Sequence, residues 1–143
     1  MSAMFEDDPF TGTWSFNGQR SKLDTPLPQS WIQEMVVSPS DVVVREKIVR
    51  WNGVRSEVRI RARFDGTDYP VADFPIADTM AYKRQGPHRI SGIGKKAGLV
   101  CLTETLTVAP DGRVLTLVYS IQSGASQVAR GIAIFSKGLT AIQ

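Results

Sequence analysis

Hydrophobic and polar residues alternate almost without error over residues 54–65. The even-numbered positions are apolar, with Ser56 as the one exception: Val54, Val58, Ile60, Ala62 and Phe64. The odd-numbered positions, 55 to 65, are occupied by six charged residues, four of them arginines. Side chains of a β-strand point to opposite faces with a period of two, so this pattern predicts a long strand with one dry and one wet face. Such strands are typical of antiparallel sheets that enclose a core or a cavity.

Turn signals divide the rest of the chain into further short extended segments. Asn52-Gly53, Asp65-Gly66 and Asp111-Gly112 are dipeptides that favour hairpin turns. No window of helical length shows apolar residues spaced by three and four, and only Ser21–Pro28 has room for a single helical turn. We therefore expect strands at 11–17, 30–38, 41–51, 54–65, 78–84, 88–96, 98–109, 113–122 and 128–137.

These strands predict an all-β fold, an antiparallel up-and-down meander of about 8–10 strands. Such a meander either stacks as two sheets or closes into a barrel, and closure removes the exposed edges. We expect residues 1–10 to form a flexible N-terminal segment and residues 11–143 to form a single barrel domain.

The composition is that of an ordinary globular protein of 143 residues, 42% hydrophobic and 22% charged. No uncharged apolar run approaches the roughly 20 residues of a membrane-spanning helix, so no membrane span is expected. The acidic start of the chain lacks the pattern of a secretory signal peptide, which favours a cytoplasmic location, with a secreted form trimmed of its signal as the alternative. Cys101 is the only cysteine, and its apolar neighbours predict a buried, unreactive thiol.

Gly12-Thr13-Trp14 opens the first expected strand, and a glycine before a large aromatic lets the indole plug one end of a barrel. This start resembles the lipocalin-like (calycin) barrels. Further segments spread along the chain resemble a group of small bacterial lipocalin-like proteins: Ser21-Lys22-Leu23, residues 64–71, Ala77-Asp78-Thr79 and residues 110–113. The resemblance implies that Trp14 closes the barrel under a basic residue of the last strand, either Arg130, which we assign to this place, or Lys137.

If the barrel closes, one parity of each strand faces its interior. Residues 98–109 then direct Val100, Leu102 and Leu106 inward, with Glu104 among them. Ligand pockets are typically apolar with a few fixed polar groups. We therefore expect polar ligand contacts from Glu46, Arg50, Glu104 and Tyr119, and apolar walls from Val58, Ile60, Leu102 and Leu117. In the alternative interpretation, the glutamates lie at the barrel rims or pair with arginines, or the parity slips across a bulge.

The resulting hypothesis is a non-catalytic protein that holds a small hydrophobic or amphipathic ligand inside the barrel. No nucleophile–base pair or phosphate-binding loop is legible in the sequence. Some lipocalin-like barrels are nevertheless enzymes that use Tyr, Arg and Glu in the cavity. An isomerase, cyclase or decarboxylase acting on a small apolar substrate is therefore the alternative hypothesis.

Other partners and cofactors have weaker support. The arginines of residues 55–63 form a basic stripe with few aromatic residues, which indicates a solvated strand face and no nucleic-acid partner. His88 is the only histidine, so we expect no metal site and no cofactor, and place it on a solvent-exposed turn. A haem site similar to that of nitrobindin remains the alternative for His88. The apolar Ile132–Phe135 segment is compatible with either a monomer or a homodimer.

Overall fold

Eleven antiparallel strands and one short 3-10 helix form the regular structure of residues 8–124 and 126–138, the part of the chain that the computed structural model describes. The nine expected strands are all present. The elements are β1 (Gly12–Phe16), η2 (Gly18–Arg20), β2 (Lys22–Leu23), β3 (Ser30–Val37), β4 (Asp41–Val49), β5 (Arg55–Arg63), β6 (Tyr69–Pro70), β7 (Thr79–Gly86), β8 (Arg89–Lys96), β9 (Leu99–Val108), β10 (Val114–Ser123) and β11 (Ser126–Lys137).

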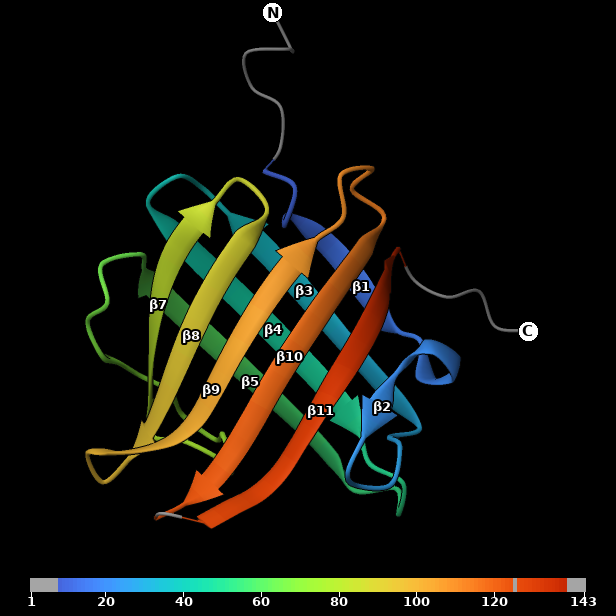
Figure 1. The fold of residues 1–143 in the computed structure, drawn as a ribbon, viewed down its shortest axis with the longest axis vertical. Coiled ribbons are helices and arrows are strands. Elements are labelled where there is room, and N and C mark those ends of the chain that lie inside the picture. The colour runs from blue at the N-terminus through green and yellow to red at the C-terminus, as the bar shows by residue number, and fades with distance from the viewer. Residues whose placement is uncertain (1–7, 125, 139–143) are drawn as a thin grey trace, which may run out of the picture.

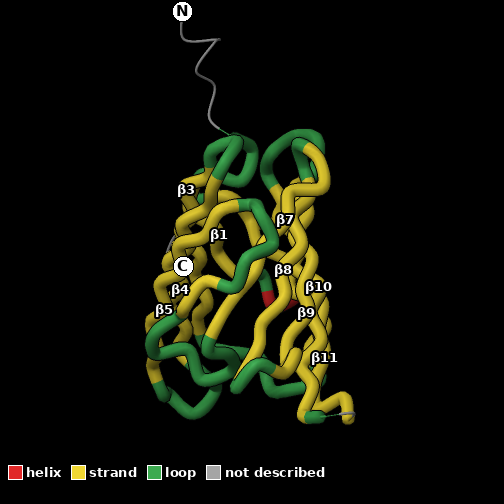
Figure 2. Tube along the Cα trace, turned by 90° about the vertical axis from the view of Figure 1, so that its left-hand side faces the viewer, coloured by secondary structure: helices red, strands yellow, loops and turns green. Residues whose placement is uncertain are grey.

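The strands form an up-and-down barrel that is nearly closed. Their order in the sheet is β5-β4-β3-β1-β11-β10-β9-β8-β7-β6, with β2 added to β11. Figure 1 shows β7 to β11 in front of β1, β3, β4 and β5, and Figure 2 shows the same two layers from the side. At the remaining seam, an isolated bridge joins Arg59 of β5 to Ala72, and the Gly66 amide donates to the Tyr82 carbonyl over 3.1 Å. The predicted barrel is therefore confirmed.

The alternation of residues 54–65 has the predicted result within β5, whereas Val54, just before β5, is exposed. Val58, Ile60 and Ala62 are buried in the barrel, and the arginines on the other parity of β5 are exposed. The described residues contain one short helical turn, as expected, and it is η2, immediately before the Ser21–Pro28 segment that had room for a turn. Pro26 and Pro28 hold the following segment extended.

One end of the barrel is packed solid around Trp14, which is 0% exposed. The indole Nε1 of Trp14 donates to the carbonyl of Phe10 over 3.0 Å. Lys137 Nζ lies 5.4 Å from the centre of the Trp14 ring, a distance at which a cation and a π-face attract. The assignment of Arg130 to this place is wrong. Arg130 is exposed and lies on the outward parity of β11, opposite to that of Lys137.

The segment before β1 completes this packed end. Phe10 is fully buried, and Arg84 forms an ion pair of 2.7 Å with Asp8 while its guanidinium lies 5.3 Å from the Phe10 ring. Residues 1–7 of the expected flexible segment lie outside the described residues. Residues 8–10 are instead part of the barrel's packing.

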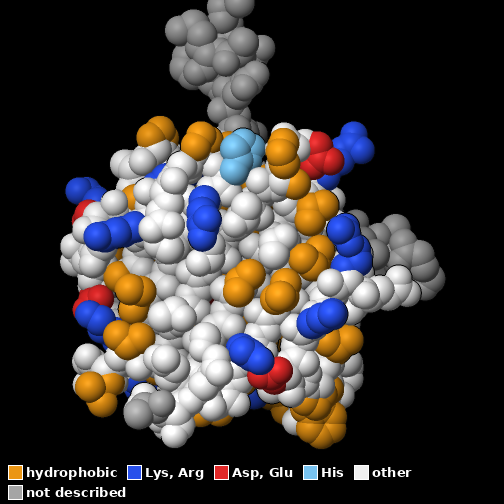
Figure 3. Space-filling model, viewed as in Figure 1, with side chains coloured by type: hydrophobic (Ala, Val, Ile, Leu, Met, Phe, Trp, Pro, Cys, Tyr) orange, Lys and Arg blue, Asp and Glu red, His pale blue; other side chains and the backbone are white. Residues whose placement is uncertain are grey.

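The outer surface carries charged residues with scattered hydrophobic ones. Figure 3 shows the face over β7 to β11, where hydrophobic side chains lie in small groups between Lys and Arg. Within Ile132–Phe135, Ala133 and Phe135 point into the core, whereas Ile132 is exposed. On β4 and β5, Arg45 pairs with Glu57 over 2.7 Å. Within residues 8–124 and 126–138, no helix has the length and hydropathy to cross a bilayer.

Candidate ligand-binding cavity

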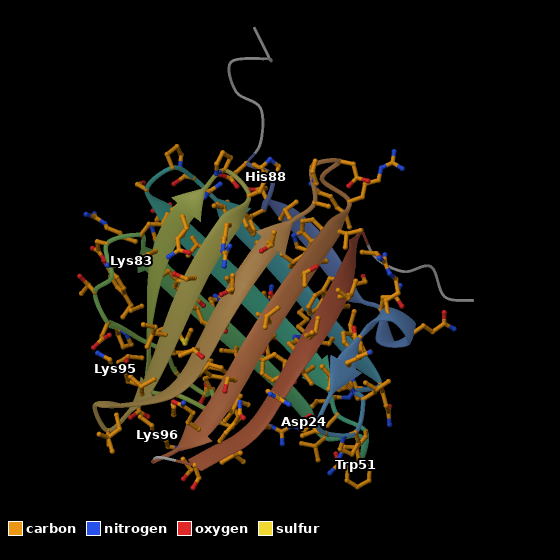
Figure 4. All side chains as sticks on the ribbon, in the orientation of Figure 1. Asp24, Trp51, Lys83, His88, Lys95 and Lys96 are labelled. Carbon is orange, nitrogen blue, oxygen red and sulfur yellow. The ribbon has the colours of Figure 1, made fainter. Side chains whose placement is uncertain are left out.

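A cavity of about 410 Å³ occupies the half of the barrel away from Trp14. Its walls are the inward side chains of the strands, and its mouth is formed by the segments around Pro26, Trp51 and Phe74. Figure 4 shows Trp51 at this open end and His88 at the opposite, packed end. The volume lies within the roughly 300–1,000 Å³ of typical ligand pockets, so the barrel is hollow where a filled one would leave no such space.

The predicted site residues lie at or beside this cavity. Seven of the eight predicted ligand contacts line it: Glu46, Arg50, Val58, Glu104, Leu102, Leu117 and Tyr119. The eighth, Ile60, lines a second and much smaller cavity of about 30 Å³ that shares Glu46 and Glu104 with the first. Their role in ligand binding stays a prediction.

The polar residues of the interior form a cluster between the two cavities. Glu46 of β4 accepts a hydrogen bond of 3.0 Å from Gln33 Nε2 on the neighbouring β3. Glu104 of β9 comes from the opposite wall, and no hydrogen bond or ion pair joins it to another described residue. Both glutamates are partly buried, and both line the two cavities. The Glu46 and Glu104 carboxyl groups therefore face a space that a ligand or water can enter.

Tyr82 of β7 joins this cluster, although sequence reasoning did not single it out. Between β7 and β9 lies Gly92 of β8, which is in register with both Tyr82 and Glu104. A Cβ at Gly92 would lie 2.9 Å from Tyr82 Cε1 and 3.0 Å from Glu104 Cγ. The missing side chain thus lets the phenol and the carboxyl group share one space. Met80 and Tyr82 have the same inward parity, which is the signal that identifies Tyr82 from sequence.

Burial raises the pKa of both interior carboxyl groups. Loss of hydration raises the pKa of Glu104 to about 8, and the nearby charge of Glu46 adds to the rise. The pKa of Glu46 is raised for the same first reason. The Gln33 amide and the indole of Trp31 offset part of that rise. Burial, followed by the charges of Glu104 and Glu46, holds the pKa of Tyr82 well above its ordinary value. At neutral pH, Glu104 and Tyr82 are therefore mainly protonated.

Trp31 supplies a further polar atom at the cavity wall. Its Nε1 is buried and forms no hydrogen bond of ordinary geometry with a described residue. The ring packs against Phe16 and Phe135, with centroids 5.5 and 5.0 Å apart. A buried donor without a well-formed hydrogen bond is costly, so this N–H, whose neighbour is Glu46, is available to a ligand or a bound water.

The smaller cavity has the size and the lining of a water site. Its volume of about 30 Å³ exceeds the roughly 10–15 Å³ that one water needs. Gln33, Glu46, Tyr82 and Glu104 supply its polar partners. An ordered water here would connect carboxyl groups that do not hydrogen-bond to one another directly.

Tyr119 lies apart from this cluster, although the sequence placed it with Glu104. The two residues are register partners on β10 and β9, but the Tyr119 ring extends the other way, over Gly131 of β11. Its oxygen would lie 2.6 Å from a Cβ at Gly131. Burial and the charge of Asp24 raise the pKa of Tyr119. Tyr119 therefore contributes to the wall near β2, and Tyr82 takes the place beside Glu104.

The remaining candidates lie outside the cavity or at its edge. Arg50 is the one Arg, Lys or His among the residues that line the main cavity, and it is exposed at the mouth. His88 is half-buried rather than fully exposed, at the packed end, with Nδ1 3.2 Å from the Val108 carbonyl. The described residues contain no cluster of three or more His, Cys, Asp or Glu suited to a metal ion.

Around Cys101, the sequence prediction of inward and outward residues is partly wrong. A register shift between Gly94 and Lys95 turns Val100 outward and Cys101 toward the interior. Cys101 is only half-buried, and its thiol donates to the Ile76 carbonyl over 3.2 Å. Burial raises the pKa of the thiol, which agrees with a thiol of low reactivity.

Comparison with solved structures identifies the architecture. The ileal bile acid-binding protein of zebrafish, complexed with cholic acid, superposes with a TM-score of 0.55, at 10% identity over 91% of this chain and 99% of that chain. The fold is that of a calycin β-barrel. Apocrustacyanin C2 matches with a TM-score of 0.47, at 12% identity over 92% of this chain and 62% of that chain. No protein-family model matches the sequence, and no curated protein does.

The calycin barrel confirms the fold that the Gly-Thr-Trp start and the strand pattern indicated. At an identity of 10%, the likeness concerns the backbone alone, and the side chains of the cavity are this chain's own. The chemistry of the site therefore depends on Glu46, Glu104 and their neighbours.

Proposed function

We propose that this barrel is a binding protein for a small hydrophobic or amphipathic molecule held in the 410 Å³ cavity. The observation that carries the proposal is the cavity itself, which is walled by apolar side chains and holds a few polar groups at its inner end. The zebrafish protein with the same fold is complexed with cholic acid, a small molecule, which supports this use of the barrel.

The physical basis of binding is the removal of apolar surface from water. Each Å² of apolar surface buried contributes roughly 25 cal/mol, and the walls around Val58, Leu102 and Leu117 offer such surface on several sides. The walls belong to hydrogen-bonded strands, so the cavity exists before the ligand arrives, which reduces the entropic cost of binding.

The test measures whether the cavity itself binds. Native mass spectrometry of the freshly purified protein reports whether a small molecule accompanies it. Titration with N-phenyl-1-naphthylamine, a neutral probe that fluoresces in apolar surroundings, then gives an affinity. Leu117→Trp should fill the cavity and weaken probe binding by more than about tenfold.

Val118→Trp is the matched control, because Val118 is the next residue of β10 and points outward. Its affinity for the probe should equal that of the parent protein. Equal probe binding by Leu117→Trp and the parent, or no binding by the parent, would refute the proposal.

A second candidate function is an enzyme that moves a proton within the same cavity. The observation in its favour is a carboxyl group with a pKa of about 8, Glu104, beside the Tyr82 phenol in an enclosed space. Such a group can donate or accept a proton near neutral pH. Turnover that Glu104→Gln abolishes, with probe binding retained, would support the enzyme; turnover at background for every substrate screened would leave the binding protein.

A further inference from the structure

We infer that the ligand is an amphipathic amine, whose protonated amino group lies between Glu46 and Glu104 while its apolar part fills the main cavity. The inference rests on the proposed binding function and assigns the chemical class of the ligand. It follows from the charges that face the cavity and from the hydrogen bonds that these groups lack.

Among the described residues, the two cavities are lined by acidic groups and by no buried cation. Around Glu104, β3 presents Gln33 and Trp31, β4 presents Glu46, and β7 presents Tyr82. Gly92 of β8 adds no side chain, and Tyr119 of β10 extends away over Gly131. The cation among the residues lining the main cavity is Arg50, exposed at the mouth. Every ionisable group at the inner end is therefore one that becomes negative on losing its proton.

This set of charges selects against an anionic ligand. Once Glu104 has lost its proton, above a pH of about 8, a carboxylate placed between Glu46 and Glu104 would meet groups of its own sign, and like charges in so enclosed a space repel strongly. No arginine or lysine of the described residues lines the inner end to offset that repulsion. A fatty-acid-like ligand would have to bind with its acid group turned toward Arg50 and the solvent.

A protonated amine supplies what the inner end lacks. An ammonium group has three N–H donors and no acceptor, and the two carboxyl groups facing the cavities are its natural acceptors. Glu104 has no hydrogen-bond partner among the described residues, and the hydrogen bond from Gln33 engages only Oε2 of Glu46. Pairing offsets the cost of holding charged carboxylates inside protein, because an isolated buried charge is unfavourable.

Proton linkage gives the inference a second consequence. The pKa of Glu104 is about 8 in the free protein, so at lower pH the carboxyl group must lose its proton to pair with a cation. Amine affinity should therefore rise with pH, by up to about tenfold per unit, and level off above pH 8 while the amine stays protonated.

The experiment compares three probes that share one chain and differ in their head group: decylamine, decanol and decanoic acid. Each displaces N-phenyl-1-naphthylamine at pH 8.5, below its aggregation concentration. Decylamine should bind at least about tenfold more tightly than decanol, and decanoic acid most weakly. Decanoic acid binding as tightly as the amine, or equal affinities for amine and alcohol, would overturn the inference.

Substitutions of the two interior glutamates test whether they cause the preference for amine over alcohol. Glu104→Gln and Glu46→Gln keep the side-chain shape, and each should reduce the ratio of decylamine affinity to decanol affinity by about tenfold or more. Glu57→Gln, on the outer face, should retain the full preference. Circular dichroism and thermal unfolding confirm that each variant is folded. A preference that persists in both interior variants would refute the assigned site.

Failure of the binding function gives a different result from failure of this inference. If neither decanol nor N-phenyl-1-naphthylamine binds, the cavity is not a binding site and both proposals fall. If both bind but the amine is not favoured, the binding function stands and the amine is excluded. A decylamine affinity that is the same at pH 6 and pH 8.5 also counts against the amine.

Discussion

The two ends of the barrel have the same strands and opposite interiors. At one end, Phe10, Trp14 and Leu115 are 0% exposed and leave no cavity between them. At the other end, the same strands enclose about 410 Å³, and an exposed Trp51 stands at the mouth. The difference shows that alternation along the strands builds the barrel, whereas the size and polarity of a few side chains decide whether it is filled.

The packed end depends on residues from outside the strands. Phe10 precedes β1 and fills space that inward strand residues leave open, and Arg84 holds this segment through Asp8. At the hollow end, Glu46 and Glu104 occupy interior positions where a larger apolar side chain would have closed the space. We therefore expect stability to reside mainly at the packed end and binding at the hollow end.

The largest effect is expected from removing the plug. Trp14→Ala should destabilise the protein by about 3–5 kcal/mol, because a fully buried indole and its hydrogen bond to Phe10 are lost. Trp51→Ala at the mouth should change the free energy of unfolding by less than about 0.5 kcal/mol, since Trp51 is 61% exposed. Urea denaturation measures both. Similar losses for the two variants would contradict the division between packed and hollow ends.

The pH dependence of stability tests the hollow end. The pKa of Glu104 is raised from 4.5 to about 8 in the folded protein, so the folded state binds this proton more tightly than the unfolded chain does. Its contribution is fully present below pH 4.5 and is lost as the pH rises to about 8. The loss is on the order of 3 kcal/mol between pH 5 and pH 8.

Glu104→Gln removes the titrating carboxyl group, so the free energy of unfolding should depend less on pH between pH 5 and pH 8. Because Glu46 also has a raised pKa, a smaller slope of the same sign should remain. Glu57→Gln should leave the parent profile unchanged over the same range, because Glu57 is exposed and its pKa is lowered by Arg45. Unfolding experiments in denaturant across this range provide the measurement, and an unchanged slope in Glu104→Gln would be evidence against a buried proton at this position.

Leu115 and Leu117 allow the packed end and the hollow end to be compared within one strand, β10. Both are inward residues of β10, but Leu115 lies in the packed end while Leu117 lines the cavity. Leu115→Ala should cost about 3 kcal/mol, and Leu117→Ala about 1 kcal/mol less, because a side chain that borders a void has fewer neighbours to lose. Equal costs in chemical denaturation would indicate that the cavity closes in solution.

The smallest effect is expected at the Arg84 anchor. Arg84→Lys keeps the charge but loses the planar fork that contacts Asp8 and the carbonyls of Gly86 and Pro87. The expected loss of stability is about 1 kcal/mol. Arg89→Lys, an exposed neighbour, should have no measurable effect on the melting temperature. A neutral Arg84→Lys would show that the segment before β1 packs without this anchor.

Much of the fold follows from local signals. The alternation in residues 54–65 and the Asn-Gly and Asp-Gly turns predict strands and hairpins, because parity and turn geometry are properties of neighbouring residues. The strands β2 and β6 escaped prediction, since a strand of two residues carries no periodicity. The shift at Cys101 depends on the pairing of β8 with β9 and is not visible in either strand alone.

The candidate site was predictable in part for the same reason. Parity places Glu46 and Glu104 inside, and parity applied to β11 would also have favoured Lys137 over Arg130. The approach of Tyr82 to Glu104 requires the register of three strands around Gly92, a relation between distant residues. Cavity volume depends on how all the inward side chains pack, so no local pattern reports it.

The seam beside β5 allows the diameter of this barrel to change. At the other junctions of the wall, paired strands are joined by backbone hydrogen bonds, whereas this seam is spanned among the described residues by the isolated bridge of Arg59 to Ala72 and the hydrogen bond of Gly66 to Tyr82. Parting the wall at this line costs fewer hydrogen bonds than parting it elsewhere. The barrel can therefore widen for a larger ligand while its other strand pairs stay intact. Amide hydrogens along this edge should exchange with solvent faster than those in β10 and β11.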